Sequence, residues 1–215
     1  MSLILDLLFP KYCLNCSKPG SYFCPHCLDQ QIINSPKLSK KNSNYDGSLS
    51  LFKYNSLIKK LITEIKYGFV TDIIDPFVNI SVSIIKKEFP HLLDYWCQHD
   101  FVIVPIPLHY FRQNWRGFNQ SVLIGKLLAK KLHLKFSDQI LFRSKNTHTQ
   151  AKLANKQDKK LNLENAFTCS NANISQNIIL FDDVATTFST LKSALKTISS
   201  YDAPSHCWFL TLSGH

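Results

Sequence analysis

Apolar residues follow two patterns along this chain: short runs, and sets repeated every three or four positions. Runs long enough for one β-strand each cover residues 49–54, 101–105, 178–181 and 207–212. Sets with helical spacing cover residues 57–65, 73–89, 117–132 and 191–198. Strands that alternate with helices are typical of parallel βαβ units, and we find no internal repeat. The pattern therefore predicts an α/β fold with a mostly parallel, twisted sheet flanked by helices.

The run at 178–181 ends in two acids and leads into a polar turn, the whole segment reading IILFDDVATTFST. Asp182 and Asp183 would stand at the carboxyl end of a buried strand, where α/β sheets bind ligands. A helix start offers free N–H groups to an anion, and hydroxyls are added by Thr186, Thr187, Ser189 and Thr190. We interpret the segment as a sugar-phosphate site. The alternative is that the acids only cap the following helix.

Four cysteines near the start of the chain have the spacing of a metal-binding knuckle. Cys13, Cys16, Cys24 and Cys27 form C-x2-C-x7-C-x2-C, which predicts a structural zinc site in a zinc-ribbon module over residues 1–34. The alternatives are two disulfides, or His26 as a substitute ligand. Because Met1–Phe9 lacks a basic start and a small-residue cleavage site, we expect a cytoplasmic chain without disulfides.

Composition sets the domain limits and the class of partner. Residues 35–47 are polar and turn-rich, which indicates a linker before a main domain over residues 48–215. The chain has 25 basic and 15 acidic residues, a net charge of +10 that attracts polyanions. No apolar stretch reaches the roughly 18 residues of a membrane-spanning helix. Only three basic residues are arginines, the side chain best suited to gripping phosphate with two hydrogen bonds.

The string at 178–190 resembles the phosphoribosyl pyrophosphate (PRPP) motif of type I phosphoribosyltransferases. Together with the cysteine module it resembles the ComF family, which is linked to competence for DNA uptake. Further matching strings are Lys66-Tyr67, Val104–Leu108 and Trp115–Gln120, with Arg143, Thr147, Gln150, Leu153, Asn162, Ala166 and Phe167. The departures are Phe188, where the family usually has glycine, and Lys160, where arginine is usual.

The resemblance implies a type I phosphoribosyltransferase-like domain with assigned roles. Asp182 and Asp183 would hold the ribose hydroxyls of PRPP, directly or through Mg²⁺. The 5'-phosphate would lie on the loop formed by Ala185, Thr186, Thr187, Phe188, Ser189 and Thr190. The pyrophosphate would lie on the loop that contains Pro107, Arg112, Arg116 and Gly117. A bulky residue at positive φ costs roughly 1 to 2 kcal/mol, so Phe188 implies either a turn that closes differently or weaker phosphate binding.

The basic segment 143–160 has three interpretations. Arg143, Gln150 and Lys160 would belong to a lid over the pyrophosphate if the family resemblance extends this far. Lys152 and Lys156 could instead track a nucleic-acid backbone, and the third interpretation is an ordinary solvated surface.

Two functions of the main domain stay open at this point, beside a third hypothesis in which the zinc-ribbon module serves as a docking or scaffold piece. The first is a PRPP-binding competence protein that contacts single-stranded DNA on the cytoplasmic side, reaching the membrane through partners in the DNA-uptake machinery. Aromatic and basic side chains suited to stacking bases are interleaved at Tyr110, Phe111, Trp115, Arg116 and Phe118. The second is an active transferase that joins ribose 5-phosphate to an unidentified base or amine. No residue stands out as the activator of such an acceptor, and His109 and His148 are candidates by chemistry alone.

Overall fold

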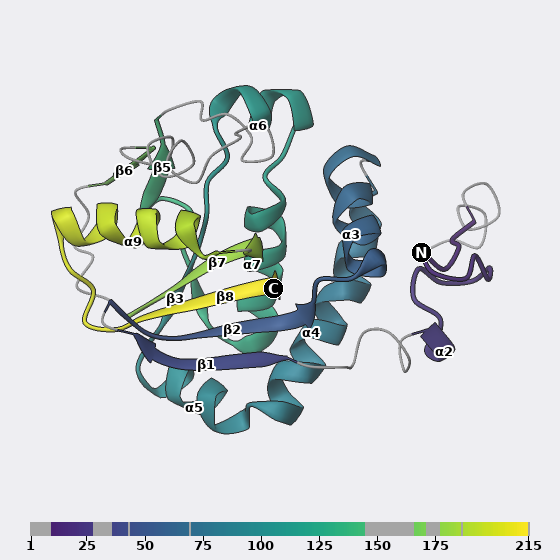
Figure 1. Ribbon diagram of the computed structural model, residues 1–215, viewed down its shortest axis with the longest axis horizontal. Helices are drawn as coiled ribbons and strands as arrows, with labels where there is room; N and C mark the ends of the chain where they lie inside the picture. The colour runs from purple at the N-terminus through teal and green to yellow at the C-terminus, as the bar shows by residue number, and fades with distance from the viewer. Residues whose placement is uncertain are drawn as a thin grey trace.

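The computed structural model describes residues 10–27, 36–42, 44–68, 70–144, 166–170, 177–185 and 187–214. Its central element is a six-stranded sheet in the order β1-β2-β8-β7-β3-β4 (Figure 1). The strands are β1 (Lys37–Asn42), β2 (Tyr45–Lys53), β3 (Val102–Pro105), β4 (Lys135–Phe136), β7 (Ile178–Ala185) and β8 (Cys207–Gly214). Only the β1–β2 pair is antiparallel among these strands. The predicted mostly parallel α/β sheet is confirmed.

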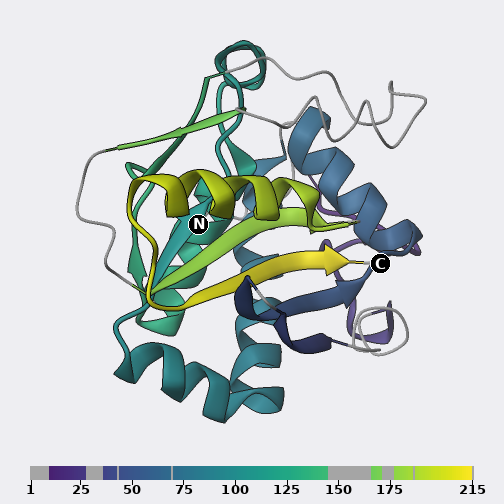
Figure 2. The ribbon, with the colours of Figure 1, turned by 60° about the vertical axis from the view of Figure 1, so that its left-hand side comes forward.

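Alternate residues of the strands feed two hydrophobic clusters, one on each face of the sheet. Ile179 and Phe181 belong to the larger cluster, whereas Ile178 and Leu180 belong to the smaller one. The larger cluster is covered by α3 (Ser56–Thr63), α4 (Ile74–Glu88), α5 (Pro90–Gln98) and α7 (Gln120–Leu132). The smaller cluster is covered by α9 (Ser189–Tyr201) and by the antiparallel pair β5 (Leu141–Arg143) and β6 (Phe167–Cys169). Figure 2 shows α9 lying along the sheet on this second face.

The structure differs from the predicted linker and from one predicted loop. Strand β1 lies inside residues 35–47 and forms the edge of the sheet. Edge strands are often rich in lysine, which prevents further pairing, so its sequence KLSKKN looked like a linker. The loop expected after β3 contains α6 (Tyr110–Arg116). Gly117 follows α6 at φ +74°, and α7 begins only at Gln120.

The cysteine module packs against the main sheet domain beside α3. Phe23 is buried in the larger cluster, with its ring centroid 6.0 Å from that of Phe77. Lys60 of α3 donates to the carbonyl oxygen of Leu14 at 2.9 Å. Within the module, a short helix α2 covers Pro25–Cys27. Residues 1–9 and 28–34 of the predicted zinc-ribbon module lie outside the described residues.

A second polar contact joins the module to the short helix η3 (Thr71–Ile73). The hydroxyl of Tyr22 donates to both carboxylate oxygens of Asp72, at 2.9 and 2.8 Å. Lys60 and Asp72 lie on either side of the π-helical turn η2 (Glu64–Gly68). The module therefore holds the chain on both sides of this turn.

Candidate functional site

The two acids lie in the last four residues of β7, at the carboxyl end of the parallel strands. Asp182 pairs in register with Thr211 of β8, and the neighbouring β3 ends at Pro105, opposite Phe181. The chain after β3 stays attached to this edge, because the N–H of Ile106 donates to the carbonyl oxygen of Phe181 at 2.8 Å. The acids therefore lie at the carboxyl end of the parallel strands, the position that the sequence predicts for them.

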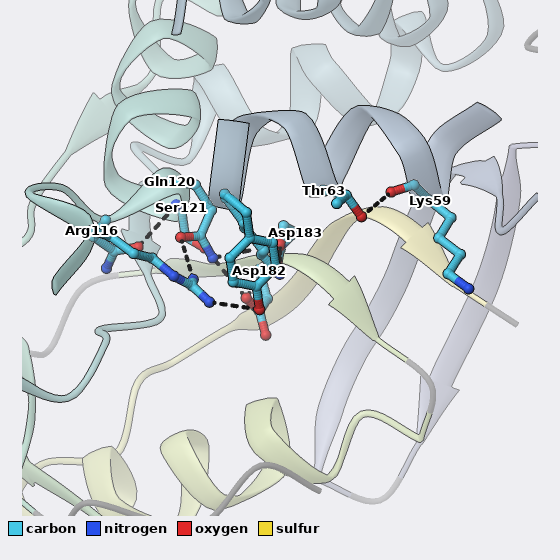
Figure 3. Close-up of polar contacts among 10 residues, drawn as sticks. Lys59, Thr63, Arg116, Gln120, Ser121, Asp182 and Asp183 are labelled. Atoms are coloured by element: carbon cyan, nitrogen blue, oxygen red, sulfur yellow. Dashed lines mark hydrogen bonds and ion pairs between the residues drawn. The ribbon is translucent and has the colours of Figure 1, made fainter. Parts of the chain in front are cut away.

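Asp183 is buried and is held by two other elements. Its carboxylate forms an ion pair with the ammonium of Lys66, and its Oδ2 accepts a hydrogen bond from Gln120 Nε2 at 3.5 Å. Figure 3 shows Gln120 and Arg116 approaching the acids from one side. Burial favours the neutral acid, but the Lys66 ammonium outweighs it and lowers the pKa of Asp183. Asp183 is therefore ionised and paired at neutral pH.

Asp182 is in a different electrostatic position. Its Oδ1 accepts a hydrogen bond from Ser121 Oγ at 3.3 Å and another from the N–H of Asp183 at 2.9 Å. Burial and the adjacent Asp183 carboxylate raise the pKa of Asp182 to about 8. At neutral pH the two acids therefore carry roughly one negative charge between them.

Helix α7 is fixed so that its first turn meets the acids. The side-chain oxygen of Asn119 accepts from the N–H of Ser121 at 3.0 Å, and its Nδ2 donates to the carbonyl oxygen of Ile106 at 3.1 Å. Gly125 allows close approach to the sheet, since a Cβ there would lie 3.1 Å from the ring of Phe181. These contacts place Gln120 and Ser121 beside Asp183 and Asp182.

Arg116 lies at the boundary between the acid pair and an exposed aromatic pair. Its guanidinium donates to Gln120 Oε1 at 3.3 Å and to the Tyr67 hydroxyl at 3.2 Å, and it lies 5.0 Å from the Tyr67 ring centroid. The ring centroids of Tyr67 and Trp115 are 5.9 Å apart. Tyr67 is 50% exposed and Trp115 is 64% exposed. Nε of Arg116 is buried without a hydrogen-bond partner among the described residues. A buried, unpaired donor of this kind suits an anionic ligand.

Sequence reasoning did not assign Lys66, Tyr67, Gln120 or Ser121 to the site. Lys66 and Tyr67 reach it because η2 is a π-helical turn at the end of α3, a deviation often found at functional sites. The strings Lys66-Tyr67 and Trp115–Gln120 belong to the resemblance, and this was the only available signal. The spacing of apolar residues gives no indication of a π-helical turn.

The turn before α9 keeps the backbone conformation for which glycine is normally used. Phe188 has φ +53° and ψ +12°, in the left-handed region, and precedes the first residue of α9. Its ring is half-buried against the smaller cluster, 5.9 Å from the ring centroid of Phe209. The turn therefore closes in a left-handed conformation, and ring packing offsets part of its strain. Thr187 Oγ donates to Ser189 Oγ at 3.0 Å, whereas Thr186 lies outside the described residues.

We expect Phe188→Ala to be less stable than Phe188→Gly by about 1 kcal/mol, because only glycine relieves the left-handed strain. Both variants lose the same ring contacts. Urea unfolding of the two variants measures the difference. The control is Lys196, an exposed residue in the middle of α9, where glycine should instead be less stable than alanine by about 1 kcal/mol. An alanine variant at position 188 as stable as the glycine variant would contradict the strain.

The remaining predicted residues are only partly described. Pro107 lies in the loop after β3, and Tyr110, Phe111 and Arg112 lie in α6, where only their backbone is described. Phe118 is half-buried and packs against the larger cluster. The guanidinium of Arg143 lies 5.3 Å from the ring centroid of Phe167. The predicted lid and nucleic-acid residues Gln150, Lys152, Lys156 and Lys160 lie outside the described residues.

The four cysteines of the module come together as a metal-binding cluster. Their sulfur atoms all lie within 4.8 Å of one another, with Cys16 Sγ and Cys24 Sγ 3.6 Å apart. Asn15 Nδ2 donates to Cys27 Sγ at 3.4 Å. Four thiolates at these separations can surround one tetrahedral metal ion with metal–sulfur distances near 2.3 Å. His26 is exposed and does not belong to this cluster.

Sequence comparison relates the chain to competence and DNA-utilization proteins. It is 29% identical over 199 residues to competence protein F of Haemophilus influenzae, covering 88% of this chain and 79% of that protein. It is 30% identical over 191 residues to competence protein ComFC of Bacillus subtilis, covering 86% and 70%. It is also 38% identical over 90 residues to the DNA utilization protein YhgH of Escherichia coli, covering 41% and 39%. No family model matches the chain.

Among solved structures, the adenine phosphoribosyltransferase of Leishmania tarentolae aligns with 83% of this chain and 95% of its own chain. The sequence identity is 14% and the TM-score is 0.41. A correspondence this loose assigns no activity.

Proposed function

The chain belongs to the ComFC family of competence proteins, and from this premise we propose that it binds PRPP, or a related phosphoribosyl ligand, and acts in the uptake of transforming DNA. Two of the relatives are named for competence and a third for DNA utilization. In this proposal the protein works on the cytoplasmic side of the membrane, contacts single-stranded DNA and is brought to the membrane by proteins of the uptake machinery.

The observation that carries the ligand proposal is the position of the acid pair beside a helix start at the carboxyl end of the sheet. Asp182 and Asp183 would accept hydrogen bonds from the ribose hydroxyls. The N–H groups at the start of α9, with the hydroxyls of Thr187 and Ser189, would hold the 5'-phosphate. Nε of Arg116 would donate to the pyrophosphate, together with the main chain around Pro107 and Gly117 and the side chain of Arg112.

Zinc is the metal we assign to the cluster of Cys13, Cys16, Cys24 and Cys27. Four cysteine sulfurs and no carboxylate ligand in the cluster are typical of a closed structural zinc site. Such an ion would hold the module together, and no catalytic step needs it.

Magnesium, the other ion that the resemblance implies, fits the acid pair poorly. A divalent cation at Asp183 would lie next to the Lys66 ammonium, which already neutralises that carboxylate. Any Mg²⁺ in this proposal is therefore carried by the pyrophosphate of the ligand and is not held by Asp183.

Single-stranded DNA is proposed as the second ligand because aromatic and cationic groups meet at the surface beside the acid pair. Tyr67 and Trp115 are exposed next to the Arg116 guanidinium, an arrangement that can stack bases and bind phosphates. The net charge of +10 favours such a polyanion.

A search of the described residues for a membrane-spanning helix finds none of sufficient length and hydropathy.

Two titrations test the proposal: PRPP by calorimetry, and an oligothymidine strand by fluorescence anisotropy at several salt concentrations. We expect both to bind, with the DNA affinity falling steeply as salt rises and about 5- to 100-fold weaker in Trp115→Ala. The control is Tyr201→Ala, which removes another exposed aromatic ring, at the end of α9. DNA binding that is insensitive to salt, or that the control weakens equally, would refute the proposed DNA contact. A lack of PRPP binding would refute the proposed phosphoribosyl site.

An active phosphoribosyltransferase is the second candidate function, and the left-handed conformation at Phe188 favours it. Because the turn keeps this conformation, the presence of phenylalanine at position 188, where the family usually has glycine, does not by itself remove the phosphate site. This candidate requires pyrophosphate release from PRPP with some base or amine, and loss of that release in Asp182→Asn. PRPP binding without release in a broad panel of acceptors would leave the first function.

A further inference from the structure

The pair Lys66–Asp183 is the most buried ion pair among the described residues. The two side chains are 19% and 7% exposed, whereas the other ion pairs of the described chain each include a side chain at least 44% exposed. Charges removed from water to this extent are retained only when they compensate each other. The ammonium is thus part of the acid site and not a surface charge near it.

Lys66 is held in this position through its neighbour in the π-helical turn. The hydroxyl of Tyr67 accepts from Arg116, which donates to Gln120 Oε1, and Gln120 in turn donates to Asp183 Oδ2. The network therefore starts at the turn, runs through α6 and α7 and returns to the carboxylate that Lys66 neutralises. This closed arrangement limits how far the ammonium can move away from Asp183.

We propose that Lys66 is the permanent counter-ion of the acid pair and occupies the place that a protein-bound divalent cation would need at Asp183. This inference rests on the proposed phosphoribosyl site and specifies its chemistry. The pair takes the hydroxyls of a pentose phosphate in the absence of a metal ion bridging to the protein. The hydroxyls are met by the carboxyl group of Asp182, which carries a proton at neutral pH and can donate as well as accept, and by the carboxylate of Asp183.

The Lys66 counter-ion also affects whether the site stabilises the intact ligand or the state in which pyrophosphate departs. When pyrophosphate leaves PRPP, positive charge develops on the ribose ring, and unpaired carboxylates would stabilise that charge. A carboxylate already neutralised by an ammonium does so less effectively. Lys66 therefore makes the site better suited to holding an intact pentose phosphate than to promoting departure of pyrophosphate.

Titration with Mn²⁺, followed by electron paramagnetic resonance, tests the inference on the full chain loaded with zinc. Wild type and Lys66→Arg should show no Mn²⁺ site that depends on Asp183. Lys66→Met should bind Mn²⁺ at least about tenfold tighter than wild type, because it frees the carboxylate. The control is Lys59→Met, which removes an exposed lysine of α3, the helix that precedes the turn (Figure 3), and should match wild type. A wild-type Mn²⁺ site lost in Asp183→Asn would overturn the proposal, as would no gain in a folded Lys66→Met.

Ribose 5-phosphate, which lacks the metal-binding pyrophosphate, provides the second measurement. Wild type should bind it with an affinity that changes less than about threefold between EDTA and Mg²⁺, whereas Lys66→Met should need Mg²⁺. A wild-type affinity that depends strongly on Mg²⁺ would overturn the inference. If ribose 5-phosphate and PRPP both fail to bind wild type, the proposed function fails, and the Mn²⁺ titration still decides the role of Lys66.

Discussion

Asp183→Ala is expected to destabilise the protein by about 3 to 5 kcal/mol, because it leaves the Lys66 ammonium buried without its partner. Asp182→Asn, one residue away, should be neutral or stabilising at neutral pH, since an amide replaces a carboxyl that is held mostly in its neutral form. Urea unfolding of both variants measures the contrast. The same experiment on Asp183→Ala combined with Lys66→Met should recover part of the loss, because the double variant contains no unpaired charge.

The two acids should also differ in how pH changes their effect on stability. The raised pKa of Asp182 means that the folded chain keeps a proton that the unfolded chain releases near pH 4. Its contribution to stability therefore falls from about pH 4 up to about pH 8, and the advantage of Asp182→Asn over wild type should grow over that interval. The pKa of Asp183 is lowered, so this residue stabilises the fold at pH values above the ordinary pKa of an aspartate. The effect is lost as the pH falls through the lowered pKa. An advantage of Asp182→Asn that shrinks as pH rises would contradict the assignment.

Removal of the metal should unfold the cysteine module while leaving the six-stranded sheet in place. The hydrophobic cluster inside the module consists of Cys13, Cys24 and Cys27, so little apolar burial remains within the module once the ion is gone. We expect a chelator, or Cys24→Ser, to release one zinc per chain and to make residues 10–27 sensitive to protease. Metal analysis and limited proteolysis measure both effects.

The loss should extend to the π-helical turn, because Leu14 and Tyr22 of the module bind Lys60 and Asp72 on either side of it. Hydrogen exchange of residues 64–68 should rise on chelation, while that of β7 stays unchanged. Cys97→Ser, which alters an exposed cysteine outside the cluster, is the control. Unchanged exchange in the turn after complete metal release would show that the module and the acid site are independent.

The apolar pattern was sufficient to predict the four central strands of the sheet, β2, β8, β7 and β3, because buried parallel strands leave a strong signal. Residues 178–181 and 207–212 are nearly continuous apolar runs, since both faces of β7 and β8 are covered. Strand β1 was missed because an edge strand buries little and its lysines resemble those of a linker. Helix α6 was missed because its seven residues are too short for helical spacing to stand out.

The acids and the cysteines could be predicted because each motif is contiguous in sequence. Lys66 and Tyr67 could not, since their role depends on a π-helical turn and on partners that lie 49 or more positions away. No local pattern records that Lys66 faces Asp183. The conformation of Phe188 is an intermediate case: the position was recognised as unusual, but only the structure shows that the backbone stays left-handed.

The order of strands in the sheet constrains when this protein can fold during synthesis. Strand β8, residues 207–214, lies between β2 and β7 and is the only described strand that pairs with both. Until the ribosome has released it, the β1–β2 hairpin and the β7-β3-β4 group share no strand that could join them. The acid pair is translated earlier, but the sheet edge that supports it is complete only once β8 has been translated.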